Sequence, residues 1–188
     1  NNPNSQATTT APYCSFSDDF SGGLTQWSNN IHWSNVGGEM RVNGTIAETD
    51  YNYTNIGSQN LSTSDYEWNF CMRYTHNPAS SNNFEFFLLS DASNLISLAN
   101  GYSVGVNRTN TSDVLTMYRV DNGVYSSIIV TPYIWVTGDD VCFRVVRTSS
   151  GDWTLFYNPN GTGEVNGGSV NDITYTSGSY IGVTNEHT

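Results

Sequence analysis

Residues 65–76 read Asp-Tyr-Glu-Trp-Asn-Phe-Cys-Met-Arg-Tyr-Thr-His, and this stretch decides the fold class. Every even-numbered position up to 74 is aromatic or apolar, whereas the odd positions carry Glu67, Asn69, Cys71 and Arg73. Successive side chains of a β-strand point to opposite faces, so the alternation predicts a strand with one buried face and one polar face.

A second stretch, Val141-Cys142-Phe143-Arg144-Val145, alternates in the same way and also places its cysteine on the polar face. If the two strands share a sheet, Cys71 and Cys142 can meet on one surface. We therefore expect a disulfide between them, which would stabilise the fold by about 4 kcal/mol in the chain-entropy model. Buried thiols, or a bridge from Cys14 to either cysteine, are the alternatives, and in our pairing Cys14 is left over.

Composition favours a single all-β domain of an extracellular protein. The chain has 188 residues, enough for one substantial core, with 12% charged and 13% aromatic residues. The aromatic residues fall in alternating runs, which argues against disorder. A formal net charge of −11 argues against nucleic-acid binding and against anionic membranes, and is compatible with neutral glycans, cationic ligands or calcium.

The sequence contains no run long enough to span a membrane, so we expect no membrane insertion. The chain begins without methionine and without an apolar signal segment, and we interpret it as a processed or excised piece. Together with the cysteines, this predicts a secreted or cell-surface location.

Turn signals divide the rest of the chain into short strands. Residues 1–13 are predicted to be a flexible arm or linker, and residues 14–188 a single domain whose first strand lies at 14–20. Asp121-Asn122-Gly123 predicts a hairpin, residues 91–100 are the only place where a helical turn is expected, and the Gly-rich stretch after Gly161 is predicted to be a loop. About eleven or twelve strands without helical periodicity predict a two-sheet antiparallel sandwich.

Three segments resemble the concanavalin A-like jelly rolls, including laminin G-like and pentraxin-like members: Glu67–Arg73, Val141–Arg147 and Gly151–Tyr157. The chain is more similar still to modules of large secreted surface proteins of gliding and polymer-degrading bacteria, through the motifs Asp19-Phe20, Trp68–Phe70, Leu89-Ser90-Asp91 and Ser179–Val183. The pentraxins place a disulfide between the corresponding strands. The resemblance also implies one more strand, rich in Phe and Asp, which does not occur before Thr188. Either the chain is truncated or something else completes that edge.

Catalytic motifs of the same superfamily are missing. Its glucanases carry Glu-x-Asp-x-x-Glu, and the nearest match, Glu48–Tyr53, ends in tyrosine where the second glutamate belongs. The lyase motifs and the Gly-x-Ser-x-Gly elbow do not occur, and His32, His76 and His187 have no metal-ligand spacing. We therefore predict a non-catalytic module, with an unrecognised glycan-active enzyme as an alternative.

Candidate ligand-binding residues follow from the polar faces and the nearby rings, because sugar sites combine fixed polar groups with aromatic faces. They are Glu67, Asn69, Arg73 and Arg144, with Trp33, Tyr102 or Trp153 as stacking rings. The competing interpretation is that the rings belong to the core and that Arg73 and Arg144 pair with Glu67 and Glu85 across the sheet. Asp18 and Asp19 are the candidate calcium ligands, although paired aspartates in a turn also serve as simple caps.

The sequence thus predicts a non-catalytic carbohydrate- or surface-binding module of a secreted or cell-surface adhesive protein, with a glycan or surface ligand as its partner. The alternative is a structural or assembly module whose open sheet edge docks another domain of the same protein or a secretion partner.

Overall fold

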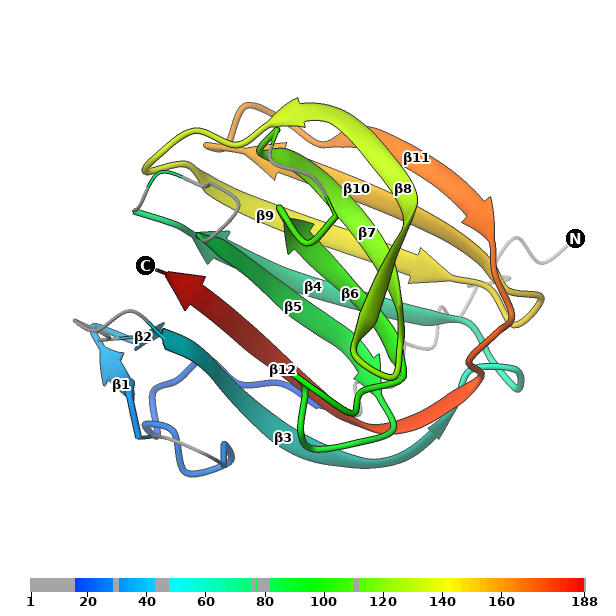
Figure 1. Ribbon diagram of the computed structural model, residues 1–188, viewed down its shortest axis with the longest axis horizontal. Helices are drawn as coiled ribbons and strands as arrows, with labels where there is room; N and C mark the ends of the chain where they lie inside the picture. Colours follow the sequence, from blue (N-terminus) through cyan, green and yellow to red (C-terminus); the bar gives the residue numbers. More distant parts are fainter. Residues whose placement is uncertain are drawn as a thin grey trace, which may run out of the picture.

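The computed structural model describes residues 16–28, 31–42, 48–75, 77, 82–109 and 112–187, without the side chains of residues 48 and 187. These residues form twelve β-strands (Figure 1). The strands are β1 (Trp33–Val36), β2 (Glu39–Val42), β3 (Glu48–Asn60), β4 (Tyr66–Arg73), β5 (Asn83–Ser90), β6 (Gly101–Val106), β7 (Val114–Asp121), β8 (Val124–Ile134), β9 (Asp140–Arg147), β10 (Asp152–Pro159), β11 (Val165–Asn171) and β12 (Ser177–His187). Within these ranges no helix could cross a membrane.

Two antiparallel sheets pack face to face and form the sandwich. One has six strands in the order β3-β12-β5-β6-β7-β8, and the other has four in the order β11-β10-β9-β4, while β1 and β2 form a separate hairpin (Figure 1). The all-β antiparallel sandwich predicted from the sequence is therefore confirmed. Residues 1–13, predicted to be an arm, and Cys14 lie outside the described residues, so their status stays a prediction.

The main core lies between the two sheets, and the even-numbered face of β4 contributes to it as predicted. The ring of Phe70 stacks on Phe86 of β5 at 4.2 Å and on Phe143 of β9 at 4.9 Å between centroids. β9 buries Val141, Phe143 and Val145 on the same side. The strand pattern of β4 and β9 thus gave the correct buried faces.

The predicted disulfide is present. β4 and β9 pair antiparallel with Cys71 directly opposite Cys142, and the two sulfur atoms are bonded at 2.01 Å. Both cysteines are exposed, on the outer face of the four-stranded sheet. The predicted hairpin is also confirmed, because β7 and β8 are joined by Asn122 and Gly123 with φ angles of 50° and 79°.

Three local predictions are wrong. Residues 16–20 form no strand, because Asp18 and Asp19 accept hydrogen bonds from the backbone of Phe20 and Ser21 and turn the chain. Residues 91–100 contain turns and no helix. The Gly-rich stretch contains β11, an edge strand paired along β10. Pairing with β10, rather than the intrinsic propensity of the Gly-rich sequence, makes this segment a strand.

Candidate functional site

The four polar residues singled out from the sequence do gather on one surface, the outer face of the four-stranded sheet. Glu67, Asn69 and Arg73 lie on β4, and Asn69 is directly opposite Arg144 of β9. Arg144 forms an ion pair with Glu164 at 2.6 Å, and Arg73 one with Asp140 at 2.7 Å.

The charges on this face mostly satisfy one another. The guanidinium of Arg144 also covers the ring of Phe156, 3.9 Å from its centroid, so that ring is not open for stacking. Exposed ion pairs of this kind contribute little to stability. Whether the face binds a ligand stays a prediction, but it offers few unoccupied donors or rings.

The three rings proposed as stacking platforms lie elsewhere. Tyr102 and Trp153 are both 0% exposed and pack against each other in the core at 4.5 Å, so they cannot stack on a ligand from solvent. Their placement in the core corrects the sequence-based assignment. Trp33 lies on β1, outside the four-stranded sheet, and lines a cleft that Glu67, Asn69 and Arg73 also border.

The hydroxyl of Tyr102 instead anchors Asp172 by donating a hydrogen bond of 2.7 Å. Arg119 Nη1 forms an ion pair with the same carboxylate at 3.0 Å. Burial alone would raise the pKa of Asp172, but the hydrogen bonds from Tyr102, from Thr174 and from Arg119 outweigh it and hold the pKa below its ordinary value of 3.8.

Replacing Asp172 with asparagine should make stability less dependent on pH. A carboxylate whose pKa is lower in the folded chain stabilises the fold above its unfolded pKa, and this stabilisation is lost as the pH falls through the folded pKa. We expect the variant to lose about 1–3 kcal/mol at pH 6. Urea unfolding at pH 6 and pH 3 should show a smaller loss on acidification in the variant than in the unmodified protein. An identical loss in both proteins would contradict this assignment.

Asp18 and Asp19 are turn-capping residues. Asp18 accepts hydrogen bonds on both carboxylate oxygens, from the Phe20 backbone at 2.7 Å and from the Trp27 indole at 2.9 Å. Calcium needs six to eight oxygen ligands. Among the residues that the structure describes, no group of three or more His, Cys, Asp or Glu side chains could hold a metal ion. Whether Asp18 or Asp19 binds calcium stays a prediction.

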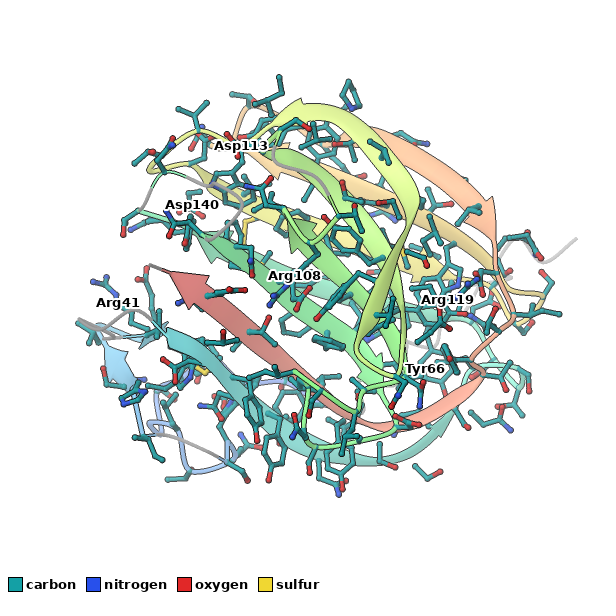
Figure 2. The ribbon with its side chains drawn as sticks, in the orientation of Figure 1. Arg41, Tyr66, Arg108, Asp113, Arg119 and Asp140 are labelled. Atoms are coloured by element: carbon teal, nitrogen blue, oxygen red, sulfur yellow. A yellow bond between two sulfur atoms is a disulfide. The ribbon has the colours of Figure 1, made fainter. Side chains whose placement is uncertain are left out.

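A second polar cluster, unlike the first, is buried on the outer face of the six-stranded sheet. Strand register places Tyr51 of β3, Thr184 of β12 and Glu85 of β5 in one cross-strand row. Alternate residues of these strands face the main core, so this row faces away from it. Figure 2 shows Arg108 lying over the same part of the sheet.

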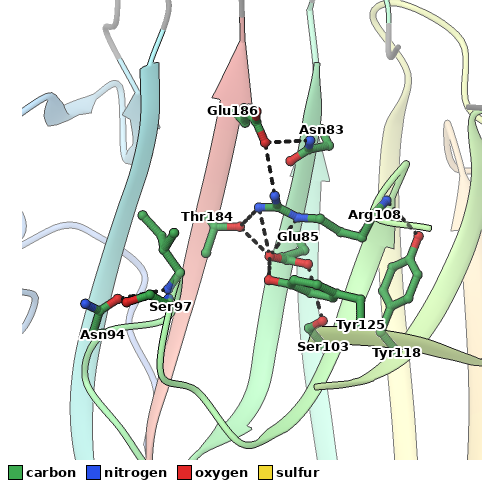
Figure 3. A network of polar contacts seen from close by, with 11 residues as sticks. Asn83, Glu85, Asn94, Ser97, Ser103, Arg108, Tyr118, Tyr125, Thr184 and Glu186 are labelled. Carbon is green, nitrogen blue, oxygen red and sulfur yellow. Dashed lines mark hydrogen bonds and ion pairs between the residues drawn. The ribbon is translucent and has the colours of Figure 1, made fainter. Parts of the chain in front are cut away.

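Glu85 is the centre of the cluster (Figure 3). Its Oε1 accepts hydrogen bonds from the hydroxyls of Thr184 and Tyr125, each at 2.6 Å, and from Arg108 Nε at 3.1 Å. Arg108 Nη2 in turn donates to Thr184 Oγ1 at 2.6 Å, and Arg108 Nη1 lies 3.3 Å from Glu186. These groups are held in one geometry before any ligand arrives.

Burial makes these interactions strong. Glu85 is 0% exposed and the Arg108 side chain 11% exposed. Burial disfavours the charge of Arg108, yet the attraction of Glu85 outweighs it and raises the pKa of the guanidinium. Burial and the charge of Glu85 also raise the pKa of Tyr125, so its hydroxyl keeps the proton that it donates.

Local sequence explains how Arg108 reaches the sheet face. Asn107 has a left-handed backbone with φ of 64°, and it exchanges hydrogen bonds with Asp113 at 2.7 and 2.9 Å. These two hydrogen bonds hold the turn after β6 that brings Arg108 over the sheet. Gly105, beside Glu85, is required because a Cβ there would lie 2.6 Å from Glu85 Cβ and 2.1 Å from the Phe84 carbonyl oxygen.

Tyrosine rings border the polar cluster. Tyr51 and Tyr53 stack with centroids 6.2 Å apart and planes at 18°, and both are partly buried. They pack against a small second core that the 91–100 segment forms on this face through Leu95 and Ala99. Asp91 and Asn100 hold the base of that segment with a side-chain hydrogen bond of 2.9 Å. We call the polar cluster and these two rings the tyrosine face.

Two acceptors on the tyrosine face retain unused capacity. Asn83, 2% exposed, donates to Glu186 Oε2 at 3.0 Å, but its Oδ1 has no hydrogen-bond partner among the described residues. Glu186 is 33% exposed. A buried acceptor without a donor is costly.

Sequence reasoning missed this cluster. Glu85 was weighed only as a partner for Arg73 or Arg144, and that pairing is wrong, because Glu85 faces away from the four-stranded sheet and pairs with Arg108. One signal was available, a single carboxylate inside the apolar run of β5. A buried charge in such a strand needs a cationic partner.

Neither a protein-family model nor a curated protein sequence matches this chain. Solved structures do. The carbohydrate-binding module CBM66 from Bacillus subtilis aligns with a TM-score of 0.60 at 13% identity, covering 85% of this chain and 87% of that one. The exoplasmic/lumenal domain of VIP36, in its Ca²⁺/Man3GlcNAc-bound form, aligns at 0.63 and 9%, covering 87% and 79%. The carbohydrate recognition domain of Emp46p, in its potassium-bound form, aligns at 0.59 and 12%, covering 92% and 87%.

At these identities the similarity establishes the fold. The chain has the concanavalin A-like jelly roll that the sequence resemblance implied.

Proposed function

We propose that this protein is a non-catalytic carbohydrate-binding module that binds its glycan on the tyrosine face. The observation that carries the proposal is the fixed network of Glu85, Arg108 and Thr184 beside the stacked rings of Tyr51 and Tyr53. Sugar recognition needs these two components together, oriented polar groups for the hydroxyls and an aromatic surface for the C–H faces.

The charge balance favours a neutral sugar. Glu85 and Glu186 surround the single cation Arg108, and the free acceptor is Asn83 Oδ1. The partly exposed carboxylate of Glu186 can accept hydrogen bonds from ligand hydroxyls, whereas a carboxylate or sulfate on the ligand would meet negative charge. The net charge of −11 opposes anionic glycans over longer distances as well.

The compartment and the larger context are part of the proposal. A disulfide in an exposed position supports an oxidising, non-cytosolic location, and we propose that the module belongs to a secreted or cell-surface adhesive protein. The solved structures with this fold include an exoplasmic/lumenal domain with Man3GlcNAc bound and a carbohydrate-binding module, which supports a binding role over an enzymatic one. A solved structure with this fold contains Ca²⁺, which supports calcium as a cofactor, although both carboxylate oxygens of Asp18 already accept hydrogen bonds.

The binding test compares the two outer faces directly. A panel of neutral and acidic oligosaccharides would identify a ligand. Calorimetry would then measure the affinity of that ligand for the unmodified protein, for Tyr51→Ala and for Phe156→Ala. Phe156 is the matched ring on the outer face of the four-stranded sheet. We expect Tyr51→Ala to weaken binding at least about tenfold, or roughly 1.4 kcal/mol, with Phe156→Ala unchanged. The reverse pattern would move the site to Glu67, Asn69, Arg73 and Arg144. No binding to any glycan at millimolar concentration would remove the proposal.

A further inference from the structure

One sheet of the sandwich has six strands and the other has four, and the additional strands lie on one side of the sandwich. β8 of the six-stranded sheet packs against β11 of the other, which closes that side. Phe70 stacks on Phe86, so β4 lies opposite β5. The strands beyond β5, namely β12 and β3, therefore have no strand opposite them among the described residues.

A cleft of about 1970 Å³ occupies this side of the sandwich. β4 lines one side of it with Trp68 and Phe70, and β12 lines another with Ile181 and Val183. The N-terminal segment and the β1–β2 hairpin close the far side, through residues that include Phe16, Trp27, Trp33 and Met40.

The apolar side chains of β4 are incompletely covered. Tyr66, Trp68, Phe70 and Met72 are all only partly buried, although they face the core. On the neighbouring strand β9, the residues that face the core are buried. In the described part of the chain β4 pairs only with β9, so its other hydrogen-bonding edge is available.

An exposed strand edge beside an apolar surface is the arrangement used when a protein binds an extended peptide as an added strand. Neighbouring strands lie about 4.8 Å apart, and the eight residues of β4 extend roughly 26 Å, so an eight-residue partner strand would match its length. Its alternate side chains would enter the cleft opposite β12.

The charge around the cleft indicates what else the strand should carry. Six acidic and two basic residues line the cleft, the basic ones being Arg41 and Arg73, but the carboxylate of Glu85 lies on the tyrosine face, where it pairs with Arg108. Both arginines are already paired, with Glu39 at 2.8 Å and Asp140 at 2.7 Å. The local field therefore favours a basic partner.

We propose that this cleft binds one extended strand of a partner polypeptide, with apolar residues at alternate positions and basic residues between them. The strand pairs antiparallel or parallel with the free edge of β4, and its apolar side chains cover Trp68, Phe70 and Val183. Val183 and Thr184 are adjacent on β12 and face opposite sides of the sheet, so the peptide site and the tyrosine face share strands but lie on different faces. The peptide site does not depend on glycan binding.

The test uses the full chain and a synthetic decapeptide that alternates lysine with valine or phenylalanine, labelled for fluorescence anisotropy. We expect the designed peptide to bind saturably. A scrambled peptide of the same composition, and a peptide with glutamate in place of lysine, should each bind with at least tenfold lower affinity. Val183→Asp should weaken binding at least tenfold, whereas Val130→Asp, the same change at an exposed position of β8, should not. Hydrogen exchange on the unmodified protein should show new protection in β4, which keeps the test valid if Val183→Asp does not fold.

Other occupants give other results. Absence of saturable binding at 1 mM peptide, or protection confined to strands other than β4, would overturn the proposal. Binding that appears only after deletion of residues 1–15 would identify the chain's own N-terminus as the occupant. A dimer in sedimentation velocity that Val183→Asp dissociates would identify a second copy instead.

Discussion

Replacing Arg108 with methionine is expected to lower the free energy of unfolding by about 3–5 kcal/mol, the largest single-residue effect on the tyrosine face. The change removes the only cation beside Glu85, which is fully buried, and leaves its carboxylate without a compensating charge. Methionine retains an apolar side chain of similar length, so the loss reports the broken ion pair rather than a cavity. Urea unfolding at pH 7 measures it.

The double variant Glu85→Gln, Arg108→Met is the matched control. Glutamine can still accept the hydrogen bonds that Tyr125 and Thr184 donate to Glu85 in the unmodified protein, and it buries no charge. We therefore expect the double variant to recover most of the stability lost in Arg108→Met, because a buried pair replaced as a unit is often neutral. If the two changes were simply additive, Glu85 and Arg108 would not be coupled in the way that we describe.

Reducing the disulfide is expected to cost about 4 kcal/mol, because Cys71 and Cys142 are 71 residues apart and the reduced chain gains the entropy of that loop when it unfolds. For a chain of this length the loss corresponds to a decrease in Tm of roughly 8–16 °C. Both sulfurs lie on an exposed face, so dithiothreitol should reach them in the folded protein.

The variant Cys71→Ser, Cys142→Ser separates the cross-link from the reducing agent. It should melt at the lower temperature of the reduced protein and should not respond to dithiothreitol. Equal Tm values for the oxidised protein and the double variant would mean that the register of β4 and β9, rather than the covalent bond, holds this part of the sheet.

The fold could be predicted from the sequence because its main signals are local. Alternation at 66–74 and 141–145 defines the buried faces of two strands, and two cysteines on the polar faces follow from the same periodicity. β11 could not be predicted, because it carries two glycines and only two valines, and becomes a strand by pairing with β10.

The candidate site could be predicted only in part, because it depends on which sheet a strand joins. The polar residues of β4 and β9 were correctly placed on one outer face. Tyr102 and Trp153 were not, since alternation cannot distinguish a ring that faces solvent from one that faces a second sheet. Glu85 lies on β5 and Arg108 follows β6, 23 residues later, and no spacing in the sequence encodes their pairing.

One measurement tests the central claim, that the tyrosine face binds a neutral glycan. The ¹⁵N-labelled protein would be titrated with the best ligand of the panel, and the amide shifts followed residue by residue. We predict saturable shifts at Tyr51, Asn83, Glu85 and Thr184, with Asn69 and Arg144 unchanged. Shifts confined to Asn69, Arg144 and their neighbours on the outer face of the four-stranded sheet would contradict the account, as would the absence of any saturable shift.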